Sequence, residues 1–238
     1  MPEPDGLVDL SVVIPCFNEE RRLPDSLAKV LPYLDGRSFE VLLVDDGSDD
    51  RTLEVMRESA AADPRLRVVS YRPNRGKGRA LAEGVKASRG RLVLVTDADF
   101  STPIDELGKL EDALGHGADV AIASRAVRGA RVELSQPIYR VLMGKTFNLL
   151  VQAVLLPGLW DTQCGFKLFR GDLARRLFAE LKVPGFGYDV DVLYRARRGG
   201  ARIVEVPVRW YNSAPTKVSA IRHSIQMFAD IFRVRFAR

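Results

Sequence analysis

Short apolar runs alternate with amphipathic segments along the first half of the chain. The runs are rich in Val, Ile and Leu, which is typical of buried strands, and the segments between them have apolar residues at helical spacing. The expected strands cover residues 10–15, 39–46, 66–71, 91–99 and 119–125, and the expected helices cover residues 25–34, 50–63, 78–88 and 103–114. This alternation predicts βαβ units and therefore an α/β fold with a mainly parallel sheet flanked by helices.

The second half of the chain, after about residue 126, has a different pattern. Helices are expected over residues 139–156 and 171–181 and, within the segment 186–200, over residues 190–198, followed by a strand over residues 201–211 and a final helix from about Lys217. The segment "WDTQCGFKLF" between the first two of these helices reads as a polar insert. Because no stretch resembles a linker, we expect a single domain over residues 1–238, in which residues 126–238 cover a site built by residues 10–125.

The unusual polar residues of the first half gather where the predicted strands end. In open α/β sheets, ligands bind beyond the carboxyl ends of the strands. Those ends are Pro15 to Glu19, Asp45 to Asp49, Asn74 to Gly78, Asp97 to Thr102, and Ser124 with Arg125. The sequence therefore predicts a binding site at this edge of the sheet.

Asp97 and Asp99 follow the apolar run "RLVLV". Side chains two residues apart on an extended chain point the same way, so both carboxylates are expected to meet one ligand. Hard oxygen ligands suit Mg²⁺ or Mn²⁺, which commonly take one or two carboxylates together with substrate phosphates. The alternative is that the two acids only end a strand and cap a helix. Their companions at four other strand ends favour the functional interpretation.

Two further motifs could contact a nucleotide. "PNRGKGRALAEG" resembles a phosphate cradle, with Gly76, Lys77 and Gly78 at a turn into a helix, but it could equally be a basic loop that caps the helix. "VDDGSDD" places acids at a strand end, where they can accept hydrogen bonds from ribose or a base. Helix capping by Ser48 or Asp49 is the competing explanation.

Composition narrows the chemistry without choosing a partner. The 238 residues are 46% hydrophobic and 28% charged, as in a globular protein, and the net charge of +5 suits nucleic acid, anionic lipid or phosphorylated ligands alike. Two cysteines without metal spacing predict a reducing, cytosolic compartment, and two isolated histidines argue against zinc. The first ten residues do not resemble a signal peptide. Since no Ser-His-Asp or Cys-His arrangement is visible, metal-assisted displacement is the simplest chemistry.

Two segments predict contact with a membrane surface. Lys145, Asn148 and Gln152 interrupt the apolar stretch of residues 139–156 at helical spacing, which indicates an amphipathic helix instead of a spanning one. Near the C-terminus, apolar residues recur at steps of three and four among arginines: Ile221, Ile225, Phe228, Phe232 and Phe236. Such helices can lie in the lipid interface, although a C-terminal helix of this kind can also pack on its own domain.

Six motifs in order carry a resemblance to a known family. "VVIPCFNEE", "VDDGSDD", "NRGKGRAL", "TDADFSTP", "ASR" and "DTQCGFKLF" resemble the family-2 inverting glycosyltransferases of the GT-A fold, and among them the polyprenyl-phosphate glycosyltransferases. The likeness covers roughly residues 10–218. It implies a Rossmann-like α/β domain, with residues 10–125 as the nucleotide-sugar-binding half and residues 126–238 as the acceptor-binding half.

The resemblance also implies roles for individual residues. Donor-binding residues would be Pro15, Phe17, Glu19, Asp46, Lys77, Asp97, Ala98, Asp99, Arg125 and Lys217. Among these, Asp97 and Asp99 form the DXD motif that holds Mg²⁺ or Mn²⁺, and Lys217 is the late lysine over the diphosphate. Asp161 and Asp189 are candidates to orient the acceptor, with helix or turn capping as the alternative.

The implied activity is transfer of a hexose, glucose from UDP-glucose in the first place, to a polyprenyl phosphate. Mannose synthases carry an arginine shortly before the late lysine, whereas Arg209 stands two residues too early here, which makes GDP-mannose the second donor. A soluble acceptor is a further alternative, and a nucleotidyltransferase or a non-catalytic sugar-nucleotide-binding module would be a different class. The expected partners are the nucleotide sugar, the lipid phosphate and the inner face of the cell membrane, peripherally from the cytoplasm, but no nucleic acid.

Overall fold

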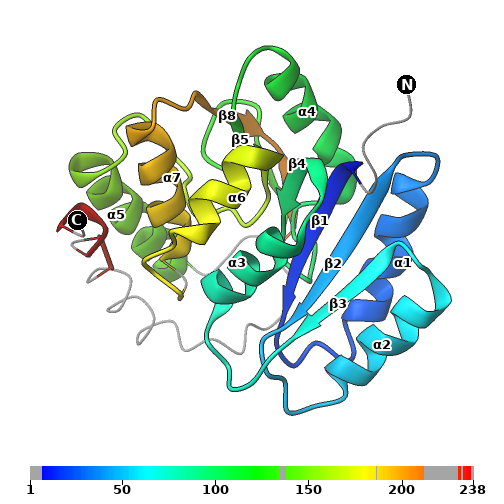
Figure 1. Ribbon diagram of the computed structural model, residues 1–238. Helices are drawn as coiled ribbons and strands as arrows, with labels where there is room; N and C mark the ends of the chain where they lie inside the picture. Colours follow the sequence, from blue (N-terminus) through cyan, green and yellow to red (C-terminus); the bar gives the residue numbers. More distant parts are fainter. Residues whose placement is uncertain (1–6, 134–137, 186, 212–229, 232, 237–238) are drawn as a thin grey trace.

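A seven-stranded sheet forms the centre of the computed structural model (Figure 1). Its strand order is β3-β2-β1-β4-β7-β5-β8, and every strand except β7 runs in the same direction. The strands are β1 (Val8–Cys16), β2 (Phe39–Asp45), β3 (Leu66–Ser70), β4 (Gly90–Val95), β5 (Val120–Ser124), β7 (Lys167–Arg170) and β8 (Ile203–Pro207). The prediction of a mainly parallel sheet is therefore confirmed.

The structure describes residues 7–133, 138–185, 187–211, 230–231 and 233–236. Helices cover both faces of the sheet, so that the molecule has three layers (Figure 1). One face carries α1 (Leu23–Leu34), α2 (Thr52–Ala62), a 3₁₀ turn (Ile104–Glu106) and α4 (Leu107–Gly115). The other carries α3 (Lys77–Ala87), α5 (Ile138–Val154), α6 (Gly171–Ala179) and α7 (Tyr188–Arg198). The helices predicted between residues 25 and 200 are thus present.

The central strands are apolar throughout because both of their faces are covered. In β1, Leu10, Val12 and Ile14 belong to the core under α1 and α4, while Val13 belongs to the core under α3. Side chains alternate between the two faces of a strand, so a run of consecutive apolar residues supplies both cores at once. This packing fixes the register that brings the ends of β1, β2 and β4 to one edge.

Strand β7 corrects the prediction for the segment from Trp160 to Phe169. The segment was expected to be a polar insert, but residues 167–170 form an antiparallel strand between β4 and β5. Lys167 interrupts the apolar run, so the sequence shows no strand pattern here. In the fold, however, the Lys167 side chain is buried. This strand joins the second half of the chain to the middle of the sheet.

Two strand boundaries also differ from the prediction. The strand expected over residues 91–99 ends at Val95, so Asp97 and Asp99 lie in a turn and not on an extended chain. The strand expected over residues 201–211 divides into β8 and β9 (Arg209–Tyr211), and β9 pairs with β6 (Arg131–Glu133) in a separate two-stranded sheet. Buried Val208 marks the division, where the chain leaves one sheet for the other.

The predicted membrane-facing segments are only partly described. Lys217 and most of the final helix lie outside the described residues, but Ile231 and Val234 are buried in the core that residues of α5 and α7 also form. Phe236, by contrast, is 74% exposed. Among the helices that the structure describes, none has both the length and the apolar character to span a bilayer.

Candidate active site

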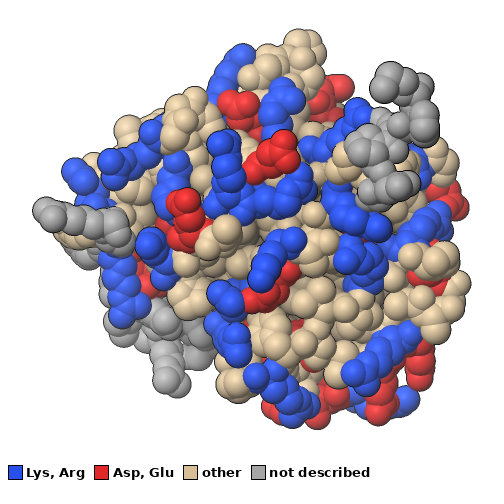
Figure 2. Space-filling view, in the orientation of Figure 1, with Lys and Arg blue, Asp and Glu red and all other residues tan. Residues whose placement is uncertain are grey.

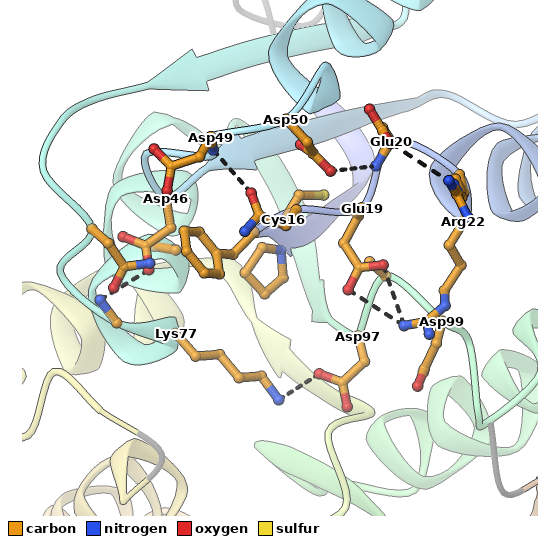
Figure 3. Close-up of a pocket in the computed structure, with 18 of the residues that line it drawn as sticks. Cys16, Glu19, Glu20, Arg22, Asp46, Asp49, Asp50, Lys77, Asp97 and Asp99 are labelled. Carbon is orange, nitrogen blue, oxygen red and sulfur yellow. Dashed lines mark hydrogen bonds and ion pairs between the residues drawn. The ribbon is translucent and has the colours of Figure 1, made fainter. Parts of the chain in front are cut away.

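The carboxyl ends of β1, β2 and β4 and the start of α3 surround an open cavity of about 1200 Å³ (Figure 3). Its lining includes most of the residues expected to bind the donor, namely Pro15, Phe17, Glu19, Asp46, Lys77, Asp97, Ala98 and Asp99. Arg125, Asp161 and Asp189 do not line this cavity, and Lys217 lies outside the described residues. The ends of β1, β2 and β4 thus line one cavity, while the end of β5 with Arg125 does not.

Asp46 shapes the cavity through the loop between β3 and α3. Its Oδ1 accepts hydrogen bonds from the Tyr71 hydroxyl and the Arg75 backbone N–H, each at 2.8 Å, and its Oδ2 accepts one from the Gly76 N–H at 2.9 Å. Burial, followed by the hydrogen bond to Asp46, raises the pKa of Tyr71. The carboxylate therefore holds the loop that leads to Lys77, the first residue of α3.

Two glycines allow the loops at this edge to approach each other. Gly47 has φ +73°, and a Cβ placed there would lie 2.9 Å from the backbone nitrogen of Asn74. Gly76 has φ +94°, and a Cβ there would lie 2.9 Å from the Pro184 carbonyl oxygen. Side chains other than hydrogen are disfavoured at such φ values, and here they would also collide with backbone. The glycines seen in the sequence thus serve backbone packing.

Lys77 and Asp97 point toward one another across the cavity and form an ion pair (Figure 3). Burial alone would raise the pKa of the Asp97 carboxyl, but Lys77, Lys167 and Arg125 together hold this pKa below its usual value. Burial lowers the pKa of Lys77, and the carboxylates of Asp97 and Asp189 more than offset this, so that it lies above its usual value. Both groups are therefore charged at neutral pH.

Asp99 lies on the other side of the same turn, beside Glu19 and Arg22 (Figure 3). Its Oδ1 accepts a hydrogen bond from the Ser101 N–H at 2.9 Å, and Glu19 forms an ion pair with Arg22 at 3.2 Å. The Ser26 hydroxyl on α1 donates to the Ala98 carbonyl at 2.6 Å, which ties the turn to the helix. The two carboxylates consequently face one cavity from a fixed turn, although not by strand alternation as expected.

Arg125 and Asp161, which were assigned separate roles from the sequence, form one partly buried unit. The guanidinium contacts both carboxylate oxygens, at 2.7 and 2.9 Å, and the Arg125 N–H adds a third hydrogen bond of 2.8 Å. Burial would raise the pKa of Asp161, but Arg125 holds it below its usual value. The Trp210 ring lies against the guanidinium, with its centroid 5.2 Å from Cζ. Asp161 thus fixes the arginine expected to meet phosphate.

Asp189 lies in the first turn of α7 and forms an ion pair with Lys167 on β7, and both side chains are buried. Burial raises the pKa of Asp189, while Lys167 and Lys77 act in the opposite direction. The alternative role of Asp189 as a helix cap is not seen, because the N-cap of α7 is Gly187. In α2 the Asp50 carboxylate accepts a hydrogen bond from the Thr52 N–H at 3.0 Å and the N-cap residue is Arg51, so neither Ser48 nor Asp49 acts as its cap.

The described residues contain no group of three or more His, Cys, Asp or Glu side chains that could hold a metal ion. A divalent cation at Asp97 and Asp99 would therefore need oxygens from a bound substrate. This fits Mg²⁺ and Mn²⁺, which are bound through one or two carboxylates together with substrate phosphates. The donor set at the turn is thus suitable for a cation delivered with a diphosphate.

Sequence reasoning missed several residues of this region. Arg22 and Asp50 line the cavity, Lys167 and Tyr188 are buried beneath it, and Gly165 contacts Asp97. One signal was available: a lysine within the apolar run "CGFKLF" is unusual, since buried lysines require a charged or hydrogen-bonding partner. The others carry no local pattern.

The fold and the acidic cavity at the strand ends define a glycosyltransferase of the GT-A type. Comparison with known families agrees, because the model described as glycosyl transferase family 2 matches residues 11–178. The chain belongs to this family. Two relatives are named dolichyl-phosphate beta-glucosyltransferase, from Dictyostelium discoideum at 33% identity and from Homo sapiens at 35%. Each alignment covers 95% of this chain and 74% of the relative.

Solved structures show the same architecture. Glucosyl-3-phosphoglycerate synthase from Mycobacterium tuberculosis, in complex with Mn²⁺, uridine diphosphate and glucosyl-3-phosphoglycerate, superposes with a TM-score of 0.72. The match covers 96% of this chain and 80% of the synthase, at 23% identity. At this identity the similarity establishes the fold alone.

Proposed function

We propose that the protein transfers glucose from UDP-glucose to a polyprenyl phosphate of the dolichyl type, with inversion at the sugar carbon. The observation that carries this proposal is the similarity to two dolichyl-phosphate beta-glucosyltransferases over 95% of the chain. The cavity supports it, because its lining combines carboxylates for a cation with a lysine for phosphate. A GDP-mannose donor and a soluble acceptor are the alternatives to be tested.

The proposed donor site extends from β1 to α3. Pro15, Phe17, Glu19 and Asp46 surround the nucleoside, and the Phe17 ring, 41% exposed, offers a face on which a base can stack. Lys77 lies at the N-terminus of α3, where the helix dipole adds to its attraction for phosphate. The diphosphate would therefore lie between the start of α3 and the turn that carries Asp97, Ala98 and Asp99.

Asp99, with help from Asp97, is proposed to hold Mg²⁺ or Mn²⁺. When bound, the cation supplies positive charge at the diphosphate, where negative charge develops as the nucleotide leaves. Asp97 has a second task, since its ion pair keeps the Lys77 ammonium directed into the cavity. Because its pKa is held low, Asp97 is available as an anion throughout the neutral range.

The transfer itself requires little proton chemistry. An oxygen of the acceptor phosphate, already ionised at neutral pH, forms the bond to the sugar carbon while the bond from that carbon to UDP breaks. Arg125 is proposed to meet phosphate in this step, and Lys217 to close over the diphosphate. Asp161 would orient the acceptor indirectly, by fixing Arg125 through their paired hydrogen bonds. Asp189, the second residue expected on the acceptor side, is buried in its ion pair with Lys167 and is given no direct contact in this step.

Because a lipid-linked acceptor stays in the bilayer, the transfer reaction would take place at a membrane surface. We propose that the protein binds peripherally to the cytoplasmic face. Leu149 on α5 is 68% exposed and Trp160 is 59% exposed. The two lie near one another, since the Asn148 side chain donates to the Trp160 carbonyl at 2.6 Å. The sequence between Glu133 and Asp161 contains Arg140 and Lys145 but no acidic residue, and the nearby Glu205 carboxylate is occupied by the backbone N–H groups of Trp160 and Asp161, which favours contact with anionic lipid. The second half of the chain would thus serve the acceptor.

Release of UDP from a panel of sugar nucleotides tests the proposal, with and without polyprenyl phosphate and with Mg²⁺, Mn²⁺ or EDTA. We expect UDP release only when UDP-glucose, lipid phosphate and a divalent cation are all present. Faster turnover of GDP-mannose would establish the alternative donor. Equal turnover with glycerol phosphate or phosphoglycerate in place of the lipid would establish a soluble acceptor.

A further inference from the structure

Lys167 is a buried cation that the proposed chemistry does not use. Its side chain is 1% exposed, and its ammonium donates to the Cys164 carbonyl and to the Asp189 carboxylate. Removing two charges from water is expensive, and an apolar pair of similar volume often stabilises a protein equally well. The contacts of this ion pair therefore suggest a purpose other than stability.

The first contact leads to Asp97. Lys167 holds the carbonyl of Cys164, and the next residue, Gly165, packs directly on the Asp97 side chain. A Cβ at Gly165 would lie 2.2 Å from Asp97 Oδ2, so backbone closes one side of the carboxylate while Lys77 occupies the other. A shift of this turn would therefore change the orientation of Asp97.

The second contact leads to Lys77. Asp189 follows Tyr188, whose ring centroid lies 5.5 Å from the Lys77 ammonium and 5.8 Å from the Lys167 ammonium. The start of α3 packs closely on the same segment, because a Cβ at Gly78 would lie 2.6 Å from the Tyr188 Cβ. The Arg79 N–H also donates to the Pro184 carbonyl at 3.0 Å. The position of α7 thus sets the position of Lys77.

We propose that Lys167 is a positioning residue for the donor site, and that Asp189 acts with it in place of contacting the acceptor. Their ion pair joins the Cys164–Gly165 turn to the first turn of α7. One of these segments orients Asp97 and the other places Lys77, so both groups are set before a sugar nucleotide binds. This inference rests on the proposed function, because it takes Lys77 and Asp97 as donor-binding residues.

The test is the variant Lys167→Met, which keeps the length of the side chain and removes its charge. We expect the Kd for UDP-glucose, measured by calorimetry with Mn²⁺, and the donor KM to rise about tenfold or more, since small misplacements of binding groups are costly. The acceptor KM should not change. If this variant does not fold, the double variant Lys167→Met with Asp189→Asn replaces it, because it also removes the buried Asp189 charge that would be left unpaired. The same Kd and KM values are then measured on the double variant.

A double-mutant cycle tests the route. Gly165→Ala pushes on Asp97 directly, so combining it with Lys167→Met should raise the Kd little beyond the larger single effect, because both act through one turn. Arg67→Met is the matched control. It removes a cation paired with the buried Glu40 carboxylate, Arg67 Nη1 to Glu40 Oε2 at 2.7 Å, at the end of β2 opposite the cavity, and should lower Tm while the UDP-glucose Kd stays unchanged.

Three results would overturn the inference. Lys167→Met could lower Tm yet bind UDP-glucose like the wild type, which would make the pair merely structural. Asp189→Asn could keep donor affinity and lose kcat, which would return Asp189 to the acceptor. The effects of Lys167→Met and Gly165→Ala on the Kd for UDP-glucose could be fully additive in free energy, which would show that they do not act through one turn. A wild-type chain that binds no UDP-sugar would instead refute the proposed function.

Discussion

Asp99 is the residue on which turnover should depend most. Replacing it with Ala removes one of the two carboxylates that we propose to hold the cation in the cavity. The expected result is near loss of UDP release and of its response to Mn²⁺, since a cation at a leaving diphosphate supplies several kcal/mol of transition-state stabilisation. Asp112→Ala, which removes an exposed acid on α4, is the control and should retain full activity. Near-normal, metal-dependent transfer by Asp99→Ala would contradict the assignment.

The ion pair of Asp161 with Arg125 should contribute to the stability of the fold. Asp161→Asn leaves the Arg125 guanidinium without its countercharge, and we expect the free energy of unfolding to fall by about 3 kcal/mol, as for other partly buried pairs that lose one partner. Urea unfolding at pH 7 measures this. A variant with wild-type stability and a reduced rate per folded molecule would instead indicate a direct part in the reaction.

The stabilisation that Asp161 provides should also depend on pH. The pKa of Asp161 is lower in the folded than in the unfolded chain, so the carboxylate contributes stability above the unfolded value of about 3.9 and loses it as pH falls through the folded pKa. The difference in unfolding free energy between wild type and Asp161→Asn should be constant above about pH 5 and shrink below about pH 4. A difference that does not vary between pH 3 and pH 7 would contradict the prediction.

At the scale of the elements, the loops between strands and helices are as closely fitted as the core. Gly47→Ala places a Cβ 2.9 Å from the Asn74 nitrogen at a φ of +73°. We expect about 1–3 kcal/mol of destabilisation and a higher donor KM, because the loop before α3 must move. Gly144→Ala in α5 is the control: its Cβ meets nothing within 4 Å, and helix propensity predicts up to about 1 kcal/mol of added stability.

The sequence was most informative where one periodicity extended over a whole element. The strands β1, β2, β4 and β5 were predicted because burial on both faces leaves long apolar runs, and the carboxyl ends of the first three located the cavity. By contrast, β7 is four residues long and includes a buried lysine, so neither alternation nor hydrophobicity distinguishes it. β6 is short and exposed, and its pairing with β9 is a long-range contact without a local signal.

The candidate site shows the same limit. Residue types and strand ends were sufficient to name Lys77, Asp97 and Asp99, since these follow from local sequence and from the topology of a parallel sheet. They were not sufficient to identify ion-pair partners. Arg125 and Asp161, for example, are 36 positions apart in the sequence. Such pairs form through tertiary packing. Sequence spacing therefore identified the charged groups but not which group neutralises which.

At the scale of the whole molecule, charge is distributed and largely balanced. Lys and Arg side chains spread over the face that carries α3, α6 and α7, with acidic side chains between them (Figure 2). Several of these cations have nearby partners, as in the ion pairs Arg79–Glu83 and Arg175–Asp172. The net charge of +5 therefore acts as a general attraction to anionic surfaces.

Membrane binding should depend on the exposed apolar residues of the second half. In flotation with vesicles containing anionic phospholipid and polyprenyl phosphate, we expect the wild type to float at low salt and Trp160→Ala combined with Leu149→Ala to float several-fold less. Tyr33→Ala, which removes a 37% exposed aromatic side chain from α1 on the other face of the sheet, is the control. Wild-type protein that stays unbound would refute the proposal of peripheral attachment.

The antiparallel insertion of β7 has a consequence for how the chain is made. When residues 1–130 have left the ribosome, β4 and β5 exist but are not neighbours, since the strand that joins them is encoded some 40 residues later. Until then, β4 presents an unpaired edge of the kind on which chains aggregate. Residues 10–125 therefore cannot complete their sheet during synthesis before residues 167–170 emerge. For the same reason, the second half of the chain cannot be exchanged as a separate module unless the replacement also supplies a strand between β4 and β5.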